Sequence, residues 1–371
     1  MTRFNAVLIV VLLGVTCFAT GISAQVFTLQ GYVDSYIASD NSKYGDPNFD
    51  AMRTYSPLNV RKNEFGLNVA QLSASVDADR YYGTFTLHYG DFTNTSWDPS
   101  YPMIQEAFAG FKFSKMISVD AGYFTTFIGN EAVLPKDNWL TSHSLAKMME
   151  PYYHAGIRGH FQITDEFRAT LLILNSLLSF DDNNENKTIG LNLAYETENF
   201  GVSYAGAFGN EVPGNTNGNY VEGLTTMFHN VNFNFNVSED FMLKAQFDMA
   251  STAAPEEPED AESLATTAFA LQGIYKFMDQ WSVAARFAYI MNEDMWASMP
   301  PVNGMGLTLG VQYAPTVNSY IRLEGRMLSF DEGEEPLFPG KVFHDGEEPT
   351  NSRMEVALNF GVAFDLLSTT P

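Results

Sequence analysis

Amide and charged side chains recur at every second position in parts of this 371-residue chain. Segment 230–237 alternates asparagines with valine and phenylalanine, and segment 322–326 alternates charged residues with Leu and Gly. Side chains of this kind bind dissolved solutes, and a wall of them selects solutes by size and charge. Both signs of charge occur, so no ion preference is predicted. The candidate residues are Arg158, His160, Asn232, Asn234, Lys244, Arg286, Arg322, Glu324 and Arg326.

No arrangement of residues indicates catalysis. The chain contains neither Gly-x-Ser-x-Gly nor His-Glu-x-x-His, and a polar wall accounts for His88, His154 and His160. The only cysteine, Cys17, lies in an apolar N-terminal segment that we expect to be removed. We therefore predict no enzyme, no catalytic residue, no metal site and no cofactor. The formal charge of −24 argues against a nucleic-acid partner.

The first 24 residues are typical of a secretory signal peptide. Arg3 precedes an apolar stretch, 6–20, and small residues at 22–24 offer a cleavage site before Gln25. The apolar stretch is short for a transmembrane helix, and no later run reaches the required length. We predict two parts: a cleaved signal peptide, 1–24, and one β-domain, 25–371.

Alternation with a period of two continues through the remaining sequence and predicts β-strands with one apolar and one polar face. Mean hydropathy is only −0.12 although the chain has 30 Phe and 18 Tyr, as expected when one face of each strand is apolar. We predict about sixteen strands, with fourteen to eighteen as the range. Their expected positions are 26–39, 64–76, 80–90, 104–113, 117–127, 152–163, 167–175, 188–196, 200–208, 225–237, 241–250, 264–277, 281–291, 304–314, 317–330 and 354–365.

The connections between these strands alternate between tight turns and long polar loops. Outer-membrane barrels have short periplasmic turns and longer extracellular loops, so the pattern predicts a closed antiparallel transmembrane barrel with both termini periplasmic. A change of phase in the second strand indicates a β-bulge near Gln71. Because Arg or Lys facing lipid costs about 2–4 kcal/mol, the apolar faces must meet lipid and the polar faces the lumen. The whole lumen face is therefore expected to be polar, with the charges of 322–326 either neutralising one another or guiding solutes.

The third long loop, 128–151, is more apolar than a solvated loop requires. Thr141 or Ser142 is expected to cap a short helix that ends near Glu150, since Pro151 disfavours helix before it. This loop packs either inside the barrel, where it narrows or plugs the pore, or on the rim. The candidate constriction residues are Glu131, Lys136, Asp137 and Trp139, of which the first three are candidates to face Arg158 or Arg286.

Several segments resemble a known family. They are 31–34 (GYVD), 63–68 (NEFGLN), 120–124 (DAGYF), 128–131 (IGNE), 136–139 (KDNW) and 151–156 (PYYHAG). This set is similar to the putative β-barrel porin family of the OmpL-like type, common in Bacteroidota. The likeness is strong over 27–176 and architectural beyond. It implies a porin in the outer membrane, and it brings no agreed substrate and no catalytic residue, so no site residue is carried over.

The leading prediction is a porin-like channel for passive diffusion of small hydrophilic solutes, with outer-membrane lipid as its surroundings. The alternative is a barrel whose lumen is plugged by loops and which binds or adheres through its acidic loops, 256–262 and 331–335. These carboxylates could bind calcium but lack the spacing of a calcium loop. General porins are often trimers, so a homotrimer is one option that the sequence leaves open.

Overall fold

The computed structural model describes residues 25–41, 55–182, 186–211, 225–253, 264–292, 302–331, 343–345 and 348–369. The expected signal peptide, 1–24, lies outside the described residues, as do the acidic segment 256–262 and residues 332–335. Within the described part, no helix has the length and apolar character needed to cross a membrane. The same part contains no group of His, Cys, Asp and Glu side chains arranged to hold a metal ion.

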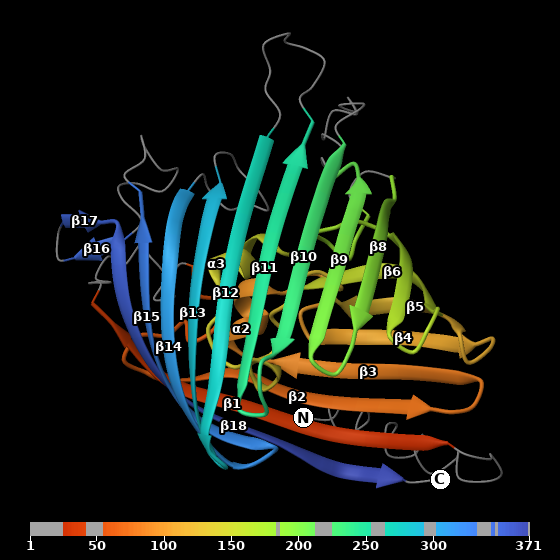
Figure 1. Cartoon of the computed structure of the whole chain (residues 1–371), viewed down its shortest axis with the longest axis horizontal. Coiled ribbons are helices and arrows are strands. Elements are labelled where there is room, and N and C mark those ends of the chain that lie inside the picture. Colours follow the sequence, from red (N-terminus) through yellow and green to blue (C-terminus); the bar gives the residue numbers. More distant parts are fainter. Residues whose placement is uncertain are drawn as a thin grey trace, which may run out of the picture.

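Sixteen strands form one closed barrel in which every neighbour is antiparallel, which confirms the predicted fold and strand count (Figure 1). The last barrel strand, β18, pairs with β1 and closes the ring. A two-stranded sheet, β16 (Phe343–Asp345) with β17 (Glu348–Thr350), lies in the last long connection. The barrel strands are β1 (Val26–Asp40), β2 (Phe65–Asp77), β3 (Tyr81–Tyr89), β4 (Ile104–Lys112), β5 (Ile117–Thr125), β6 (Tyr153–Gln162), β7 (Phe167–Leu174), β8 (Thr188–Glu196), β9 (Phe200–Gly209), β10 (Thr226–Asn236), β11 (Phe241–Thr252), β12 (Leu264–Met278), β13 (Trp281–Asn292), β14 (Val302–Thr316), β15 (Ser319–Phe330) and β18 (Ser352–Thr369).

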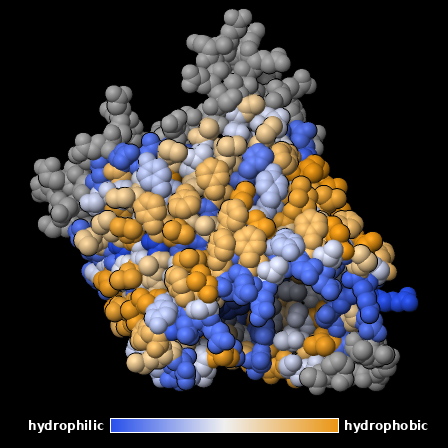
Figure 2. Space-filling view, in the orientation of Figure 1, coloured by the Kyte–Doolittle hydropathy of each residue, from blue (hydrophilic) through white to orange (hydrophobic). Residues whose placement is uncertain are grey.

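Alternation along each strand separates an outer apolar face from an inner face. On β13, Trp281 and Phe287 are 40% and 37% exposed, whereas Arg286 is 3% exposed. Figure 2 shows apolar side chains spread over the outer surface of the strands, with hydrophilic side chains gathered below them. Such a surface is stable only against lipid, because an exposed apolar area of this size is otherwise a site of aggregation or association.

The bulge in β2 lies at Asn68, so the expected position near Gln71 is wrong. The pairing of β1 with β2 shifts where Asp34 faces Val69 and Ser35 faces Leu67. Asn68 has no ladder partner, and its amide points inward, where Nδ2 donates to Asp34 Oδ1 at 2.6 Å. A buried amide must be hydrogen-bonded, and this requirement turns two consecutive residues of β2 toward the interior.

The interior of the barrel contains two short helices supplied by the loops, α2 (Asp91–Ser96) and α3 (Leu145–Met149) (Figure 1). The 3₁₀-helix η1 (Pro135–Asp137) also lies inside, where the carbonyl of Pro135 accepts from Arg322 on β15. Helix α3 packs in an apolar core against the inner face of β9–β15 near their long-loop ends. Small side chains on this wall leave room for the helix: Ala205, Ala207, Ala250, Ala268, Ala270 and Ala288. The expectation of a polar lumen face throughout is therefore wrong for the long-loop ends of these strands.

Candidate functional site

Residues 126–152, here called the inner loop, fold into the barrel rather than over its rim. The loop leaves β5 and crosses the lumen to the opposite wall. There the backbone N–H of Gly129 donates to Asn230 Oδ1 on β10 at 3.2 Å, and that of Asn130 donates to Gln246 Oε1 on β11 at 2.9 Å. The lumen is thereby divided by a segment bonded to several strands.

The short helix of the inner loop ends where the sequence predicts, with Glu150 following Met149, but its cap differs. Ser144 is the N-cap, and its hydroxyl accepts the N–H of Lys147 at 3.0 Å. The proposed caps Thr141 and Ser142 instead donate their N–H groups to Glu324. The Glu324 carboxylate on β15 thus binds the two residues that were expected to cap the helix. The sequence near Thr141 and Ser142 does not reveal this distant partner.

Arg286 on β13 anchors the inner loop through a buried ion pair. Its Nη1 lies 2.5 Å from Glu131 Oε1 and donates to the carbonyl of Ser142 at 2.6 Å. Its Nη2 donates to Ser142 Oγ at 2.9 Å and to Thr308 Oγ1 at 3.2 Å. Both charged side chains are about 2% exposed, so they face each other and not an aqueous opening.

The charges of segment 322–326 bind loops in the same way. Arg322 donates to the carbonyl of Asn138 at 2.9 Å and to Thr141 Oγ1 at 3.0 Å, while Glu324 accepts from Thr141 N at 2.8 Å. Arg326 holds the first long loop, donating to Ser56 Oγ and to the carbonyl of Tyr55, both at 3.0 Å. All three charged residues are buried. Arg322 and Glu324 thus hold the inner loop against β15, and Arg326 holds the first long loop against it.

On the other side of the inner loop three polar cavities follow one another. The largest, here called the vestibule, has a volume of about 1060 Å³ and is bounded by the short turns at 77–80 and 113–116. The amide pocket, about 310 Å³, lies between the inner loop and β6–β10 and shares His160, Arg168 and Thr170 with the vestibule. The side cavity, about 410 Å³, lies between the inner loop and β2–β5 and shares Gly129 and Asn130 with the amide pocket.

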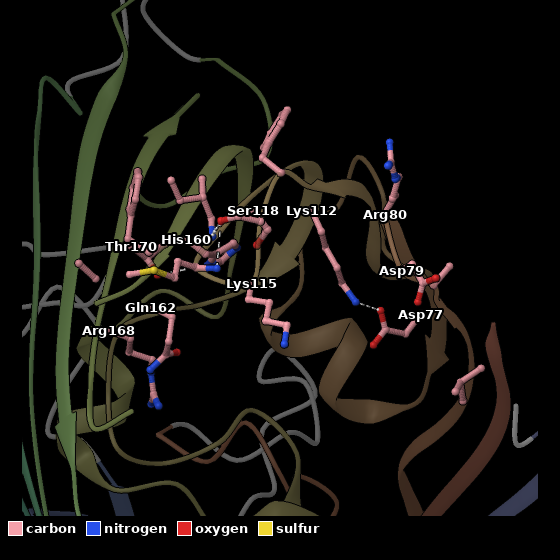
Figure 3. Close-up of a pocket in the computed structure, with 18 residues that line it drawn as sticks. Asp77, Asp79, Arg80, Lys112, Lys115, Ser118, His160, Gln162, Arg168 and Thr170 are labelled. Atoms are coloured by element: carbon pink, nitrogen blue, oxygen red, sulfur yellow. Dashed lines mark hydrogen bonds and ion pairs between the residues drawn. The ribbon is translucent and has the colours of Figure 1, made fainter. Parts of the chain in front are cut away.

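Basic side chains of the vestibule extend into it from several strands (Figure 3). Lys112 forms an ion pair with Asp77, whereas Lys115 extends into the open space between Lys112 and Arg168. Arg168 also reaches Glu196, with its two guanidinium nitrogens 2.7 and 3.1 Å from the carboxylate. The vestibule is therefore a wide polar mouth with cations and anions interspersed.

Two of the predicted residues, Arg158 and His160, lie together in the wall of the amide pocket. Both contact Asp120, with Arg158 Nε at 2.7 Å from Oδ1 and His160 Nε2 at 2.9 Å from Oδ2. Asp120 faces Arg158 directly in the β5–β6 ladder. Its inward parity in the fifth predicted strand is a signal that sequence reasoning missed.

The remaining predicted residues lie in three places. Asn232 and Asn234 line the amide pocket, and Lys136 and Asp137 are the exposed residues of η1 at the edge of the side cavity. Lys244 lies 4.6 Å above the ring of Trp139, a cation–π contact that attaches the inner loop to β11. The structure thus brings most of the predicted residues around the inner loop, whereas Arg326 binds the first long loop.

Burial controls the protonation of the inner loop. Burial raises the pKa of Glu150 to about 8, and it outweighs the lowering effect of Lys147, whose Nζ lies 2.7 Å away. The Asp248 carboxyl group on β11 adds a smaller increase to this pKa. Burial lowers the pKa of His143 to about 3. For Glu131, burial would raise the pKa, but the Arg286 guanidinium and the hydrogen bonds from Ser144 together outweigh burial and hold the pKa below its usual range. No local pattern in the sequence indicates that Glu150 is buried beside a second carboxyl group.

The sequence model of one protein family matches residues 26–364, and its description is "Putative beta-barrel porin-2, OmpL-like". None of the curated proteins matches the chain by sequence.

Solved structures of outer-membrane proteins share the fold at low sequence identity. The outer-membrane channel DcaP of Acinetobacter baumannii has a TM-score of 0.60 at 11% identity, covering 94% of this chain and 100% of that one. The anion-selective porin from Comamonas acidovorans has a TM-score of 0.59 at 13% identity, covering 92% and 100%. The trimer form of OmpT from Vibrio cholerae has the same TM-score, identity and coverage.

Proposed function

The chain belongs to the β-barrel porin family described as OmpL-like, and we propose that it is a narrow channel for passive diffusion of small hydrophilic solutes across the outer membrane. The observation that carries this proposal is the chain of three polar cavities along one side of the inner loop, linked by shared lining residues. A wet polar path through an otherwise apolar barrier is what a hydrophilic solute needs.

The proposed path enters through the vestibule, passes the amide pocket and leaves along the side cavity. We place its selective part at the side cavity, which is lined by Lys136 and Asp137 of η1 and by Gln105 and Glu106 of β4. Charges exposed at such a place act on each passing ion, whereas the buried anchors act through the position of the loop. We assign selectivity to the exposed pair and gating to the anchors.

The inferred arrangement in the membrane follows family features. We propose a cleaved signal peptide, 1–24, with short turns and both termini in the periplasm and long loops outside. A homotrimer is consistent with the trimeric OmpT structure, and we propose it as the assembly to test by cross-linking. The proposed role is transport, without catalysis.

A plugged barrel that binds at the cell surface is the second candidate. It is favoured by the apolar core between α3 and β9–β15, which occupies part of the lumen. In that case a correctly folded barrel conducts no ions.

Conductance in planar bilayers distinguishes the two. Folded protein, recognised by faster gel migration without boiling, should give discrete conductance steps. Replacing Lys136 with Glu should shift the reversal potential in a salt gradient toward cations, whereas Lys276→Glu, on an exposed lumen-facing position near a short turn, should shift it less. Folded barrels that give no steps would favour the plugged barrel.

A further inference from the structure

The amide pocket contains more hydrogen-bonding groups than a passage needs. We propose that it is a binding site for neutral polyhydroxylated solutes, the chemistry of sugars, on the path of the proposed channel, on which this inference rests. Three properties of the pocket support it: the chemistry of its wall, the balance of its charges and its shape.

The wall presents amides from three elements: Asn130 of the inner loop, Asn192 of β8, and Asn232 and Asn234 of β10. An amide offers both donors and acceptors, as a sugar hydroxyl does, so the two are complementary in either direction. Asn234 Oδ1 is buried and has no hydrogen-bond partner among the residues that the structure describes. Buried polar atoms are normally bonded, and a solute hydroxyl at this position would supply the missing donor.

The charges of the pocket already have partners. Arg158 is held by Asp120 at 2.7 Å, and Arg168 is held by both oxygens of Glu196. An ionic solute would therefore meet no unpaired opposite charge, and it would lose hydration without a compensating ion pair. A neutral solute loses less hydration free energy on entry, and its hydroxyl can donate the hydrogen bond that Asn234 Oδ1 lacks.

The shape of the pocket adds an apolar surface of the kind that binding sites combine with a few polar groups. The ring of Phe127 lies over Gly190 of β8, where a Cβ atom would come 3.0 Å from Phe127 Cζ. The absence of a side chain at Gly190 allows the ring to lie close to the wall, where it can contact the C–H face of a sugar ring. A volume of about 310 Å³ is at the lower end for ligand pockets and suits a solute of one or two sugar rings.

The experiment compares three solutes of similar size: D-glucose, D-glucosamine and D-gluconate. Each is titrated against the ion current of the folded wild-type channel, and binding to detergent-folded protein is measured by calorimetry. We expect glucose to interrupt the current and to bind more tightly than its charged analogues. The variant N232A/N234A should bind glucose about tenfold more weakly, the effect of losing one or two hydrogen bonds. Its ion conductance should remain close to the wild-type value.

Two further variants separate this role from a structural one. Asn236→Ala is the matched control, because Asn236 lies on the same face of β10, is exposed, and is outside the pocket. It should leave glucose binding unchanged. Asn234→Asp should favour glucosamine over glucose, since it adds an unpaired charge at the same place.

Ion conductance without any preference for glucose would overturn this inference and leave the proposed channel intact. Absence of conductance would overturn the channel, and calorimetry with glucose would then decide whether the pocket binds sugars.

Discussion

Replacing Arg286 with methionine should release the inner loop from the wall. The substitution keeps an unbranched apolar side chain in place of the arginine stem and removes the four hydrogen bonds to Glu131, Ser142 and Thr308. It also leaves the Glu131 carboxylate buried without its cation. Removing one partner of a buried ion pair costs about 3–5 kcal/mol. Since about 1.4 kcal/mol corresponds to a tenfold change in an equilibrium constant, the fraction of molecules with a released inner loop should rise between about a hundredfold and a few thousandfold.

The release can be measured as the labelling rate of a cysteine introduced at Ala146, which is fully buried in α3. A small thiol reagent should label A146C in the R286M background faster by that factor. A cysteine at the exposed position Asp137 is the control, and its labelling should change little. The double variant E131Q/R286M removes both charges and should restore slow labelling, because replacing both partners of a buried pair is often nearly neutral. Equal labelling rates of A146C with and without the R286M substitution would refute the anchoring role.

Three other substitutions test the packing of the inner loop, each read from the temperature at which folded gel mobility is lost. Glu150 has a pKa of about 8 in the folded protein and about 4.5 in the unfolded chain, so the folded state binds the carboxyl proton more tightly and loses stability as pH rises from about 4.5 to about 8. Glu150→Gln should make the melting temperature less dependent on pH in this range. The same pH dependence in the variant as in wild type would contradict the raised pKa. Gly129 has φ +97°, and a Cβ atom at this position would clash with the Glu150 carboxylate. Gly129→Ala should therefore lower the free energy of unfolding by about 1–3 kcal/mol. A melting temperature equal to that of wild type would show that the loop adapts to the added methyl group. Ala250→Leu should overfill the core beneath α3 and cost about 1–3 kcal/mol, which a raised melting temperature would disprove.

The barrel was predictable because its signals are local. Alternation with a period of two and the contrast between short turns and long loops are both visible within a few tens of residues. Each predicted strand has a counterpart in the barrel. Even the displaced bulge belongs to the correct strand, and the error came from the Asn68 amide, which turns inward to bond Asp34 on β1.

The contents of the lumen were less predictable because they depend on distant pairs. Glu131 and Arg286 are 155 positions apart, and Glu324 takes the N–H groups of residues expected to cap a helix. Alanines on the inner face, such as Ala250 and Ala270, are small enough to suit either a wet wall or a packed one. The position of α3 decides whether these alanines face water or a packed core, and the bonds of Arg286, Arg322 and Glu324 to the inner loop set that position.

The proposed channel requires that solutes pass along the side cavity, and a blocking experiment can locate their path. A cysteine at Asp137 lies on the exposed edge of the inner loop, and one at Lys276 lies on an exposed, lumen-facing position near a short turn. A bulky charged thiol reagent should reduce single-channel conductance strongly through D137C and only weakly through K276C. Full conductance through the modified D137C channel would contradict a path along the side cavity.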